Sequence, residues 1–300
     1  MHRRRTGHCR DLRACGLMSK WDAWIGRTQA QSDTLDAALA RRWCATFDLE
    51  VPDGPMPQGI HLCLCTPEAA TASLGSDGHP SRDESDDSFF PPIPLPRRMW
   101  AASDIAFLAP LEIGAVITRT SRIASVSEKE GTTGKLGFVD VEHVTLADGV
   151  EAVRETQTLV YRDAAAPDAP LSPPEPGDGT FDTSAWDVVQ TMTPSETLLF
   201  RYSALTFNTH RIHYDTPYAR DEERYRGLVV HGPLITSLLL QLAAQEFGDN
   251  ALATLAFRAV SPAIVGEPLH LALRPSDEGI ELGSFASDGR QTLKAVAGLA

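Results

Sequence analysis

The chain has 300 residues, of which 42% are apolar and 22% charged, with 22 Gly and 21 Pro. This is the balance of a globular protein long enough for about two domains, and it excludes collagen, a coiled coil and global disorder. The formal net charge of −13 argues against a nucleic-acid-binding surface, because phosphate binding depends on clustered Lys and Arg. An anionic ligand would therefore need a local group of arginines.

The cysteines and the apolar runs indicate where in the cell the protein is located. The five cysteines lack the pattern of a secreted disulfide framework, so reduced thiols in the cytoplasm are expected. Cys63 and Cys65 lie in an apolar run without the spacing of a zinc site, and we interpret them as small buried side chains. The most apolar stretch, Leu228 to Ala244, is interrupted by His231 and falls short of a membrane span. The sequence predicts a cytoplasmic protein that binds neither membrane nor nucleic acid.

The first residues of the chain differ from the rest. Residues 1–17 hold five arginines and one acid, which is superficially like an organelle transit peptide. The alternative, which we favour, is a mis-set start, with translation beginning at Met18. After this segment, Leu35, Leu39, Trp43 and Phe47 have the spacing of an amphipathic helix.

Two further segments precede a run of predicted strands. Residues 76–88 are rich in acids and are interpreted as a solvated surface loop. Phe89 to Pro96 is proline-rich and extended, and it cannot be a central strand. Alternating patterns then predict strands at about 115–126, 136–146 and 150–161, with a hairpin turn at Asp148-Gly149.

A proline-rich segment divides the chain, and the two sides share landmarks. Residues 163–180 have no apolar period and are interpreted as a linker between domains at 18–162 and 181–300. Pro110 and Gly114 recur as Pro262 and Gly266, each displaced by 152 residues. Asp288-Gly289 also repeats the turn chemistry of the first half. This matching order and spacing predicts a duplicated α+β unit.

Each half is expected to contain one long buried helix. In the second half Gly232 and Pro233 open a helix whose apolar residues surround it almost completely, as in Leu234, Leu238 and Leu242. Its counterpart in the first half is placed at Pro67 to Leu74. The predicted architecture is α+β, with two antiparallel sheets that each wrap a helix and pack as a pseudo-dimer.

One polar cluster has the composition of a catalytic site. Residues 200–217 include Asn208, His210 and His213, and the helix that starts at Gly232 follows shortly after. The free backbone N–H groups and the dipole of a helix start can polarise a carbonyl oxygen. An imidazole that activates water beside such a helix start predicts addition of water across a double bond conjugated to that carbonyl, or the reverse elimination.

The cluster resembles a known family. Tyr202 to Ala219 is similar to the signature of the MaoC-like enoyl-thioester hydratases, and from about Trp21 onward the chain resembles their two-domain branch, which includes mesaconyl-C4-CoA hydratases, itaconyl-CoA hydratases and 3-hydroxyacyl-thioester dehydratases. The motifs that carry the resemblance are Asp77 to Pro80, Pro94 to Trp100, Gly134 to Val139, Arg201 to Ala204, His210 to Asp215 and Gly227 to Leu234. The resemblance implies a double hot-dog fold and a hydro-lyase of short acyl-CoA thioesters, with no metal or redox cofactor and coenzyme A only as part of the substrate.

The resemblance also implies residue roles, with one departure from the general signature. The positions five and three residues before the active-site His213, where that signature has Asp and Asn, hold Asn208 and His210. An amide cannot act as a general base. We therefore expect His213 to be the acid–base residue, Asn208 to hold the water, and His210 to help or support His213. The backbone N–H of Gly232 would bind the thioester oxygen.

Other residues near the cluster have two interpretations each. His231 either takes part in the site or simply caps the helix or packs, and Tyr202 is placed with the substrate-binding residues. Asp215 is expected to hold a turn. A metal site at His210, His213 and Asp215 is disfavoured, because Tyr202 to Asn208 resembles a strand that runs into a loop.

Arginines near Trp100 are the candidate anion ligands. Arg97 and Arg98 bind a substrate carboxylate or the coenzyme A phosphates, or else form a surface ion pair. Arg201 and Arg211 are the other local cations to consider. The competing functions are an acyl-CoA thioesterase and a non-catalytic acyl-CoA-binding protein. A homodimer remains open, since a duplicated hot-dog can mimic a dimer within one chain.

Overall fold

The computed structural model describes residues 20–131 and 134–300. The expectations for residues 1–17, and the two cysteines Cys9 and Cys15, lie outside the described residues. Across the described ranges no helix is both long and apolar enough to cross a membrane. Cys63 and Cys65 are buried in the main core, as the apolar run predicted.

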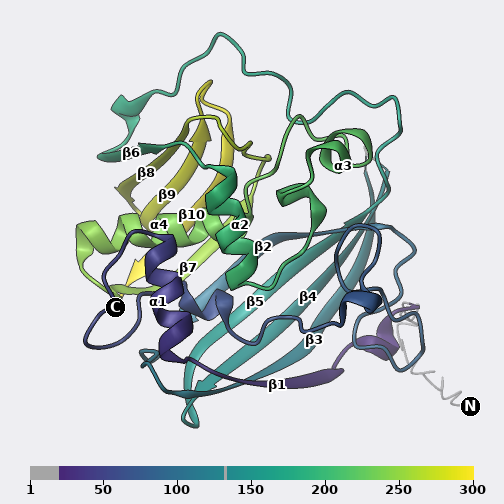
Figure 1. The fold of residues 1–300 in the computed structure, drawn as a ribbon, viewed down its shortest axis with the longest axis horizontal. Helices are drawn as coiled ribbons and strands as arrows, with labels where there is room; N and C mark the ends of the chain where they lie inside the picture. Colours follow the sequence, from purple (N-terminus) through teal and green to yellow (C-terminus); the bar gives the residue numbers. More distant parts are fainter. Residues whose placement is uncertain (1–19, 132–133) are drawn as a thin grey trace, which may run out of the picture.

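The described strands form one continuous antiparallel sheet of ten strands (Figure 1), in the order β1-β3-β4-β5-β2-β7-β10-β9-β8-β6. The prediction of two antiparallel units is confirmed, but their sheets join edge to edge through β2 and β7. The strands are β1 Thr28–Thr34, β2 Arg97–Phe107, β3 Val116–Gly131, β4 Gly134–Ala147, β5 Val150–Arg162, β6 Val188–Met192, β7 Leu252–Ala259, β8 Leu269–Ser276, β9 Gly279–Ala286 and β10 Gln291–Leu299.

The turns between strands form where the sequence chemistry predicts them. β4 and β5 are joined at Asp148 and Gly149, whose φ angles of 49° and 82° lie in the left-handed region that tight hairpins require. Asp288 and Gly289 lie at the corresponding turn between β9 and β10. The three strands predicted in the first half are confirmed as β3, β4 and β5.

The strand order reveals an internal two-fold relation. Read from the two ends of the sheet toward the middle, β1-β3-β4-β5-β2 and β6-β8-β9-β10-β7 follow the same plan. At the junction, Asp104 of β2 pairs with Ala256 of β7, and these residues are 152 positions apart. This separation equals the offset between Pro110 and Pro262. A residue that pairs with its own equivalent lies on the two-fold axis, so the topology supports the duplication inferred from the sequence.

The long helix of the second half is confirmed as α4, Gly232–Phe247. Pro233 occupies its first turn, and Leu234, Leu239 and Leu242 have 1% or less of their surface exposed. The helix contacts β7, β8 and β9, which curve around it. Each such leucine removes its apolar surface from water, which stabilises the fold by about 1.5–3 kcal/mol.

The predicted counterpart at Pro67 to Leu74 is wrong. That segment contains only a 3₁₀ turn, η3 Thr71–Ser73, preceded by η2 Ile60–Cys63. The apolar residues there lack helical spacing, and Pro67 removes a backbone donor. The amphipathic helix predicted from Leu35 to Phe47 is confirmed as α1 Ala37–Thr46, whose N-terminus is capped by Asp36.

A second element also differs from the sequence prediction. Tyr202 to Asn208 does not begin as a strand, because α2 spans Glu196–Leu205 and is capped by Ser195. α2 lies against α1 and is its equivalent in the second half, while η5 Arg211–His213 and α3 Thr216–Asp221 follow it. Residues 163–180 contain neither helix nor strand. The loop that carries His210 and His213, residues 206–213, begins directly after α2. We call it the histidine loop.

Candidate active site

A cavity of about 1360 Å³ opens between the two halves of the molecule. Its lining brings together parts of the chain that are far apart in sequence. From the second half come the loop after α2 and the start of α4, and from the first half come the 78–82 segment and strands β2 and β5. Asn208, His210, His213, Tyr202, His231, Gly232, Trp100, Arg97 and Arg98 all line it.

The loop after α2 sets the positions of two predicted catalytic residues. The Asn208 side-chain oxygen accepts a hydrogen bond from the His210 backbone N–H at 3.0 Å, which closes a local turn. One turn of 3₁₀ helix then brings His213 beside His210, with ring centroids 5.6 Å apart. The amide oxygen of Asn208 is therefore engaged with the backbone, while its NH₂ group remains a donor.

His213 presents one nitrogen as a proton acceptor. Its Nδ1 lies 2.7 Å from the carbonyl oxygen of Val229, and since a carbonyl only accepts, Nδ1 carries the proton. Nε2 is left with a lone pair. Burial, reinforced by the nearby His210, lowers the pKa of His213 to about 3, which keeps the imidazole neutral. The side chain thus has the protonation state that a base needs.

His231 and Gly232 form the adjoining wall of the site. The His231 ring stacks on His213 with centroids 3.5 Å apart, and its Nε2 lies 2.8 Å from the Ser203 hydroxyl. His231 occupies the N-cap position of α4 without a side-chain capping bond, so the capping interpretation is wrong. Within 4 Å of where a Cβ on Gly232 would lie there is open space. The start of α4 is accessible to a ligand oxygen.

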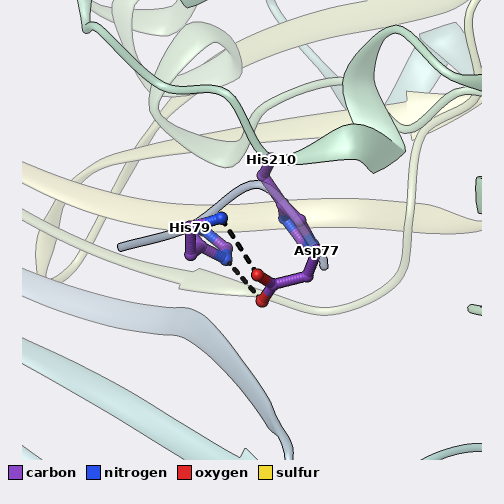
Figure 2. A group of neighbouring side chains, drawn as sticks. All are labelled: Asp77, His79 and His210. Atoms are coloured by element: carbon purple, nitrogen blue, oxygen red, sulfur yellow. Dashed lines mark hydrogen bonds and ion pairs between the residues drawn. The ribbon is translucent and has the colours of Figure 1, made fainter. Parts of the chain in front are cut away.

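The first half contributes a carboxylate and an imidazole that the sequence interpretation placed in a solvated loop. Asp77 and His79 dock on the histidine loop, so the surface-loop assignment of residues 76–88 is wrong for this part. The backbone N–H of Arg211 donates to the Asp77 carbonyl at 2.9 Å, and the Thr209 hydroxyl donates to the Gly78 carbonyl at 2.6 Å. The His79 ring lies beside that of His210 (Figure 2). Their ring centroids are 4.1 Å apart.

Asp77 and His79 form a hydrogen-bonded pair. The Asp77 carboxylate accepts from His79 Nδ1 at 3.1 Å and from the His79 backbone N–H at 3.0 Å (Figure 2). Burial alone would raise the pKa of Asp77, but these hydrogen bonds and the positive charge that His79 can hold bring it down to about 2. Burial lowers the pKa of His210 to about 3. An ionised carboxylate therefore lies at the end of a row of imidazoles.

The same side chains are the group, within the described ranges, whose arrangement comes nearest to a metal site. Ligand atoms of Asp77, His79 and His210 lie within 4.8 Å of one another. However, Nδ1 of His79 already donates to Asp77, and the rings of His79 and His210 lie 4.1 Å apart with 35° between their planes. Ring nitrogens that bind one metal must direct their in-plane lone pairs at a common point. The geometry is that of an Asp–His pair.

The predicted arginines have different surroundings. Arg97 is buried and ion-paired with Glu223, with its guanidinium over the Tyr225 ring. Arg98 lies over Phe90 and forms no ion pair with a described residue. Trp100 donates from Nε1 to the Ser103 hydroxyl at 2.8 Å. Of the two arginines, Arg98 is therefore the one still available to bind an anionic ligand.

Two other predicted cations lie outside the cavity. Arg211 binds Asp215 at 2.7 Å and the Ser76 carbonyl at 2.9 Å, so its guanidinium braces the two docked loops. Arg201 donates to the Ala45 carbonyl at 3.0 Å, at the end of α1. Neither lines the cavity. Asp215 caps α3 through the Tyr218 backbone N–H at 3.1 Å, as its predicted turn role requires.

Several residues of the site and its cavity were not predicted from the sequence. His79 lines the cavity with Asp77 hydrogen-bonded to it, and two further arginines line it with neither an ion pair nor a side-chain hydrogen bond to a described residue, Arg162 on β5 and Arg258 on β7. The Asp-Gly-His-Pro motif is part of the resemblance, but the acids that follow it indicate a surface loop. No local signal marks Arg162 or Arg258.

Comparison with known proteins decides the family. The family described as hydroxyacyl-thioester dehydratase type 2 matches residues 59–265. The chain belongs to this family. Its members are hydro-lyases of acyl thioesters, the class that the site chemistry and the resemblance predicted. A similar protein is the mesaconyl-C4-CoA hydratase of Chloroflexus aurantiacus, 40% identical over 285 residues that make up 93% of this chain and 98% of the relative.

More distant relatives extend the comparison. The mitochondrial hydroxyacyl-thioester dehydratase type 2 of Schizosaccharomyces pombe is 26% identical over 82% of this chain and 87% of its own. The structure of HtdX from Mycobacterium tuberculosis matches with a TM-score of 0.65 at 16% identity, over 91% of this chain and 100% of that one. A second M. tuberculosis structure, described as a double hot-dog fold, matches at 0.55 and 12%, over 92% and 96%. The predicted double hot-dog fold is confirmed.

Proposed function

We propose that this chain catalyses the reversible hydration of a short enoyl-CoA thioester, with His213 as the base that takes a proton from water. The observation that carries the proposal is the hydrogen bond between His213 Nδ1 and the Val229 carbonyl, which leaves Nε2 unprotonated. His213 lines the same cavity as the open start of α4. A base and a carbonyl-polarising group thereby line the same cavity.

The start of α4 supplies the electrophilic half of the reaction. The backbone N–H of Gly232 would donate to the thioester oxygen, since Pro233 has no N–H to offer. The positive end of the helix dipole adds to this polarisation. Negative charge that develops on the oxygen as the enolate forms is stabilised more than the ground-state carbonyl, which lowers the barrier.

His213 and Asn208 would serve the water molecule. The amide NH₂ of Asn208 donates to the water oxygen and holds it, while Nε2 of His213 accepts a proton as the oxygen adds to the β-carbon. The enolate charge compensates the imidazolium that forms on His213, so a histidine that is neutral before the reaction becomes a sufficient base during it. His210 supports His213 from the side.

The substrate class follows from the relative and from the cavity charges. The similar C. aurantiacus protein is a mesaconyl-C4-CoA hydratase, which indicates a five-carbon dicarboxylic acyl group such as mesaconyl or itaconyl. Such a thioester is anionic at both ends. On a chain with net charge −13 the unpaired Arg98, Arg162 and Arg258 are the cavity groups that would hold the carboxylate and the coenzyme A phosphates.

A substrate panel tests the proposal. Purified protein mixed with mesaconyl-C4-CoA, itaconyl-CoA and crotonyl-CoA should remove the conjugated enoyl-thioester absorbance of at least one. Release of free thiol, followed with a thiol reagent, would indicate a thioesterase instead. Binding of all three by folded protein without reaction would indicate the non-catalytic acyl-CoA-binding protein.

The organisation of the chain is part of the same proposal. We place the first hot-dog unit at residues 18–162, the linker at 163–180 and the unit with the hydratase motif at 181–300. The cytoplasm remains the proposed location, although one relative is mitochondrial. A full-length protein and one that starts at Met18, each fused to a fluorescent reporter, would separate a leader from a mis-set start.

A further inference from the structure

We propose that Asp77 and His79, both from the first half of the chain, form the second acid–base pair of this site, with His79 delivering the proton to the α-carbon of the thioester. This inference rests on the proposed hydratase function and assigns a further catalytic residue to it. His79 lines the same cavity as His213 and Gly232, so it can touch the substrate.

The need for such a pair comes from the chemistry at Asn208. Hydration requires one group to take a proton from water and one to give a proton to the α-carbon. An amide can do neither, and the Asn208 oxygen is bound to the His210 backbone N–H. Asp77 supplies the carboxylate that Asn208 lacks, although it lies 133 positions before His210 in the chain.

The pair has the geometry of an orienting carboxylate and a working imidazole. Asp77 accepts from Nδ1 of His79 at 3.1 Å, so in the imidazolium form of His79 the transferable proton is the one on Nε2. The half-buried carboxylate of Asp77 compensates the charge of that imidazolium. A second hydrogen bond, from the His79 backbone N–H at 3.0 Å, keeps the carboxylate in place.

The loop that carries the pair is held tightly against the histidine loop. Gly78 has φ +86°, and a Cβ at this position would lie 1.9 Å from the Thr209 carbonyl oxygen, so only glycine allows the approach. The hydrogen bonds from Thr209 and Arg211 close the contact. Preorganisation of this kind is what a proton donor requires.

The proton balance of the step is complete. One O–H bond of water breaks and its proton passes to His213 Nε2, while the water oxygen bonds to the β-carbon. The electron pair of the double bond forms the enolate, and the α-carbon then takes the proton from His79 Nε2. His213 returns its proton to His79 through His210, whose ring lies 5.6 Å from one and 4.1 Å from the other.

The test compares His79→Gln and Asp77→Asn with matched controls on the panel substrate that the wild type hydrates. The kcat of His79→Gln should fall about 10²–10⁴-fold, and that of Asp77→Asn by less, with KM within threefold. His270→Gln and Asp86→Asn remove an imidazole in β8 and an exposed carboxylate on the same loop as Asp77, both away from the cavity. They should leave kcat within twofold.

Two measurements separate catalysis from a structural role. Butyryl-CoA, which has no double bond, should bind His79→Gln with an unchanged Kd. Added imidazole should restore at least tenfold activity to His79→Ala but not to Gly78→Ala, in which the loop is displaced. Retention of more than a third of kcat in His79→Gln overturns the proposal, as does loss of butyryl-CoA binding in parallel with kcat.

Two further outcomes are distinct. Stoichiometric zinc in the purified protein that is lost in His79→Gln would also overturn the proposal, because a metal-bound imidazole cannot donate. If the wild type hydrates none of the panel, the proposed function has failed. If the wild type is active and His79→Gln is equally active, only the role of His79 has failed.

Discussion

The imidazole of His213 lies face to face with that of His231, with ring centroids 3.5 Å apart and 19° between their planes. Because His231 is the residue just before α4, this stack ties the proposed base to the proposed oxyanion site. The Ser203 hydroxyl lies 2.8 Å from Nε2 of His231 and fixes the orientation of that ring. A ligand oxygen at Gly232 therefore meets a base whose position is set by the same helix start.

Substitution His213→Gln should abolish hydration and leave binding intact. The glutamine can still donate to the Val229 carbonyl, but it offers no basic nitrogen, so kcat should fall about 10²–10⁴-fold. The control Ser203→Ala keeps the ring stack and should cost only about 1 kcal/mol of stability. Steady-state kinetics and butyryl-CoA titration measure the two effects. Unchanged kcat in His213→Gln would remove this residue from the mechanism.

Stability should fall as the solution becomes acidic, and His143 should account for part of the fall. Burial, helped by Arg119, lowers the pKa of His143 from 6.5 to about 4. Between these values the unfolded chain binds a proton that the folded chain does not, so the free energy of unfolding falls as pH falls through this window. Each such histidine contributes a slope of about 1.4 kcal/mol per pH unit.

The matched variants are His143→Gln and His270→Gln. The first should reduce the slope of the free energy of unfolding between pH 4.5 and 6 by about 1 kcal/mol per pH unit. The second removes a histidine that is only half-buried and should change the slope less. Urea unfolding at several pH values measures it. An unaltered slope in His143→Gln would show that this histidine titrates normally in the folded chain.

Gly78→Ala should damage activity far more than Gly114→Ala. Both glycines have positive φ, at 86° and 98°, so both substitutions strain the backbone by about 1 kcal/mol. A Cβ at Gly114 meets nothing within 4 Å, whereas one at Gly78 collides with the Thr209 carbonyl. Comparison of kcat with melting temperature for the two variants checks this. Equal activities would mean that the loop contact is dispensable.

Glu223→Gln should strongly destabilise the chain. Arg97 and Glu223 pair with side chains only 7% and 12% exposed, so the neutral glutamine leaves a buried charge without compensation. Loss of one partner in such a pair costs about 3–5 kcal/mol. The double variant Arg97→Met with Glu223→Leu should be closer to wild type in urea unfolding. A cost below about 1 kcal/mol for Glu223→Gln would place the pair in contact with solvent.

Arg98→Ala and Arg258→Ala should weaken the binding of coenzyme A thioesters. Both arginines line the cavity without an ion pair to a described residue, so their loss should raise KM about tenfold with little change in kcat, and the effect should shrink as salt is added. Arg154→Ala is the control, because that arginine is exposed and paired with Glu151 at 2.7 Å. Equal KM values for all three variants would exclude these arginines from binding.

Local chemistry accounts for what the sequence predicted correctly. The proline at the first turn of α4, the leucines behind it and the Asp-Gly turns each act within a few residues of themselves. The helix α2, in contrast, was not predicted. Aromatic residues such as Tyr202 favour a strand on propensity, while the capping Ser195 and the packing against α1 select a helix.

The carboxylate of the site could not be predicted in this way. Thr209 and Gly78 meet across 131 positions, and the residues after His79 are acidic and exposed, which indicates a surface loop. Contacts of such long range leave no periodic signal. The ion pair of Arg97 with Glu223 also joins residues that are far apart in the chain, so the sequence did not predict it. Because Arg97 is paired with Glu223, it is no longer available as one of the predicted anion ligands.

The junction at Asp104 and Ala256 has a consequence for stoichiometry. Two identical subunits related by such an axis would carry two equal sites. Here the halves have diverged, because in the described residues of the first half no long helix offers a counterpart to Gly232. Each chain should therefore bind one acyl thioester, and titration with butyryl-CoA should saturate at one equivalent per chain whatever the number of chains that associate.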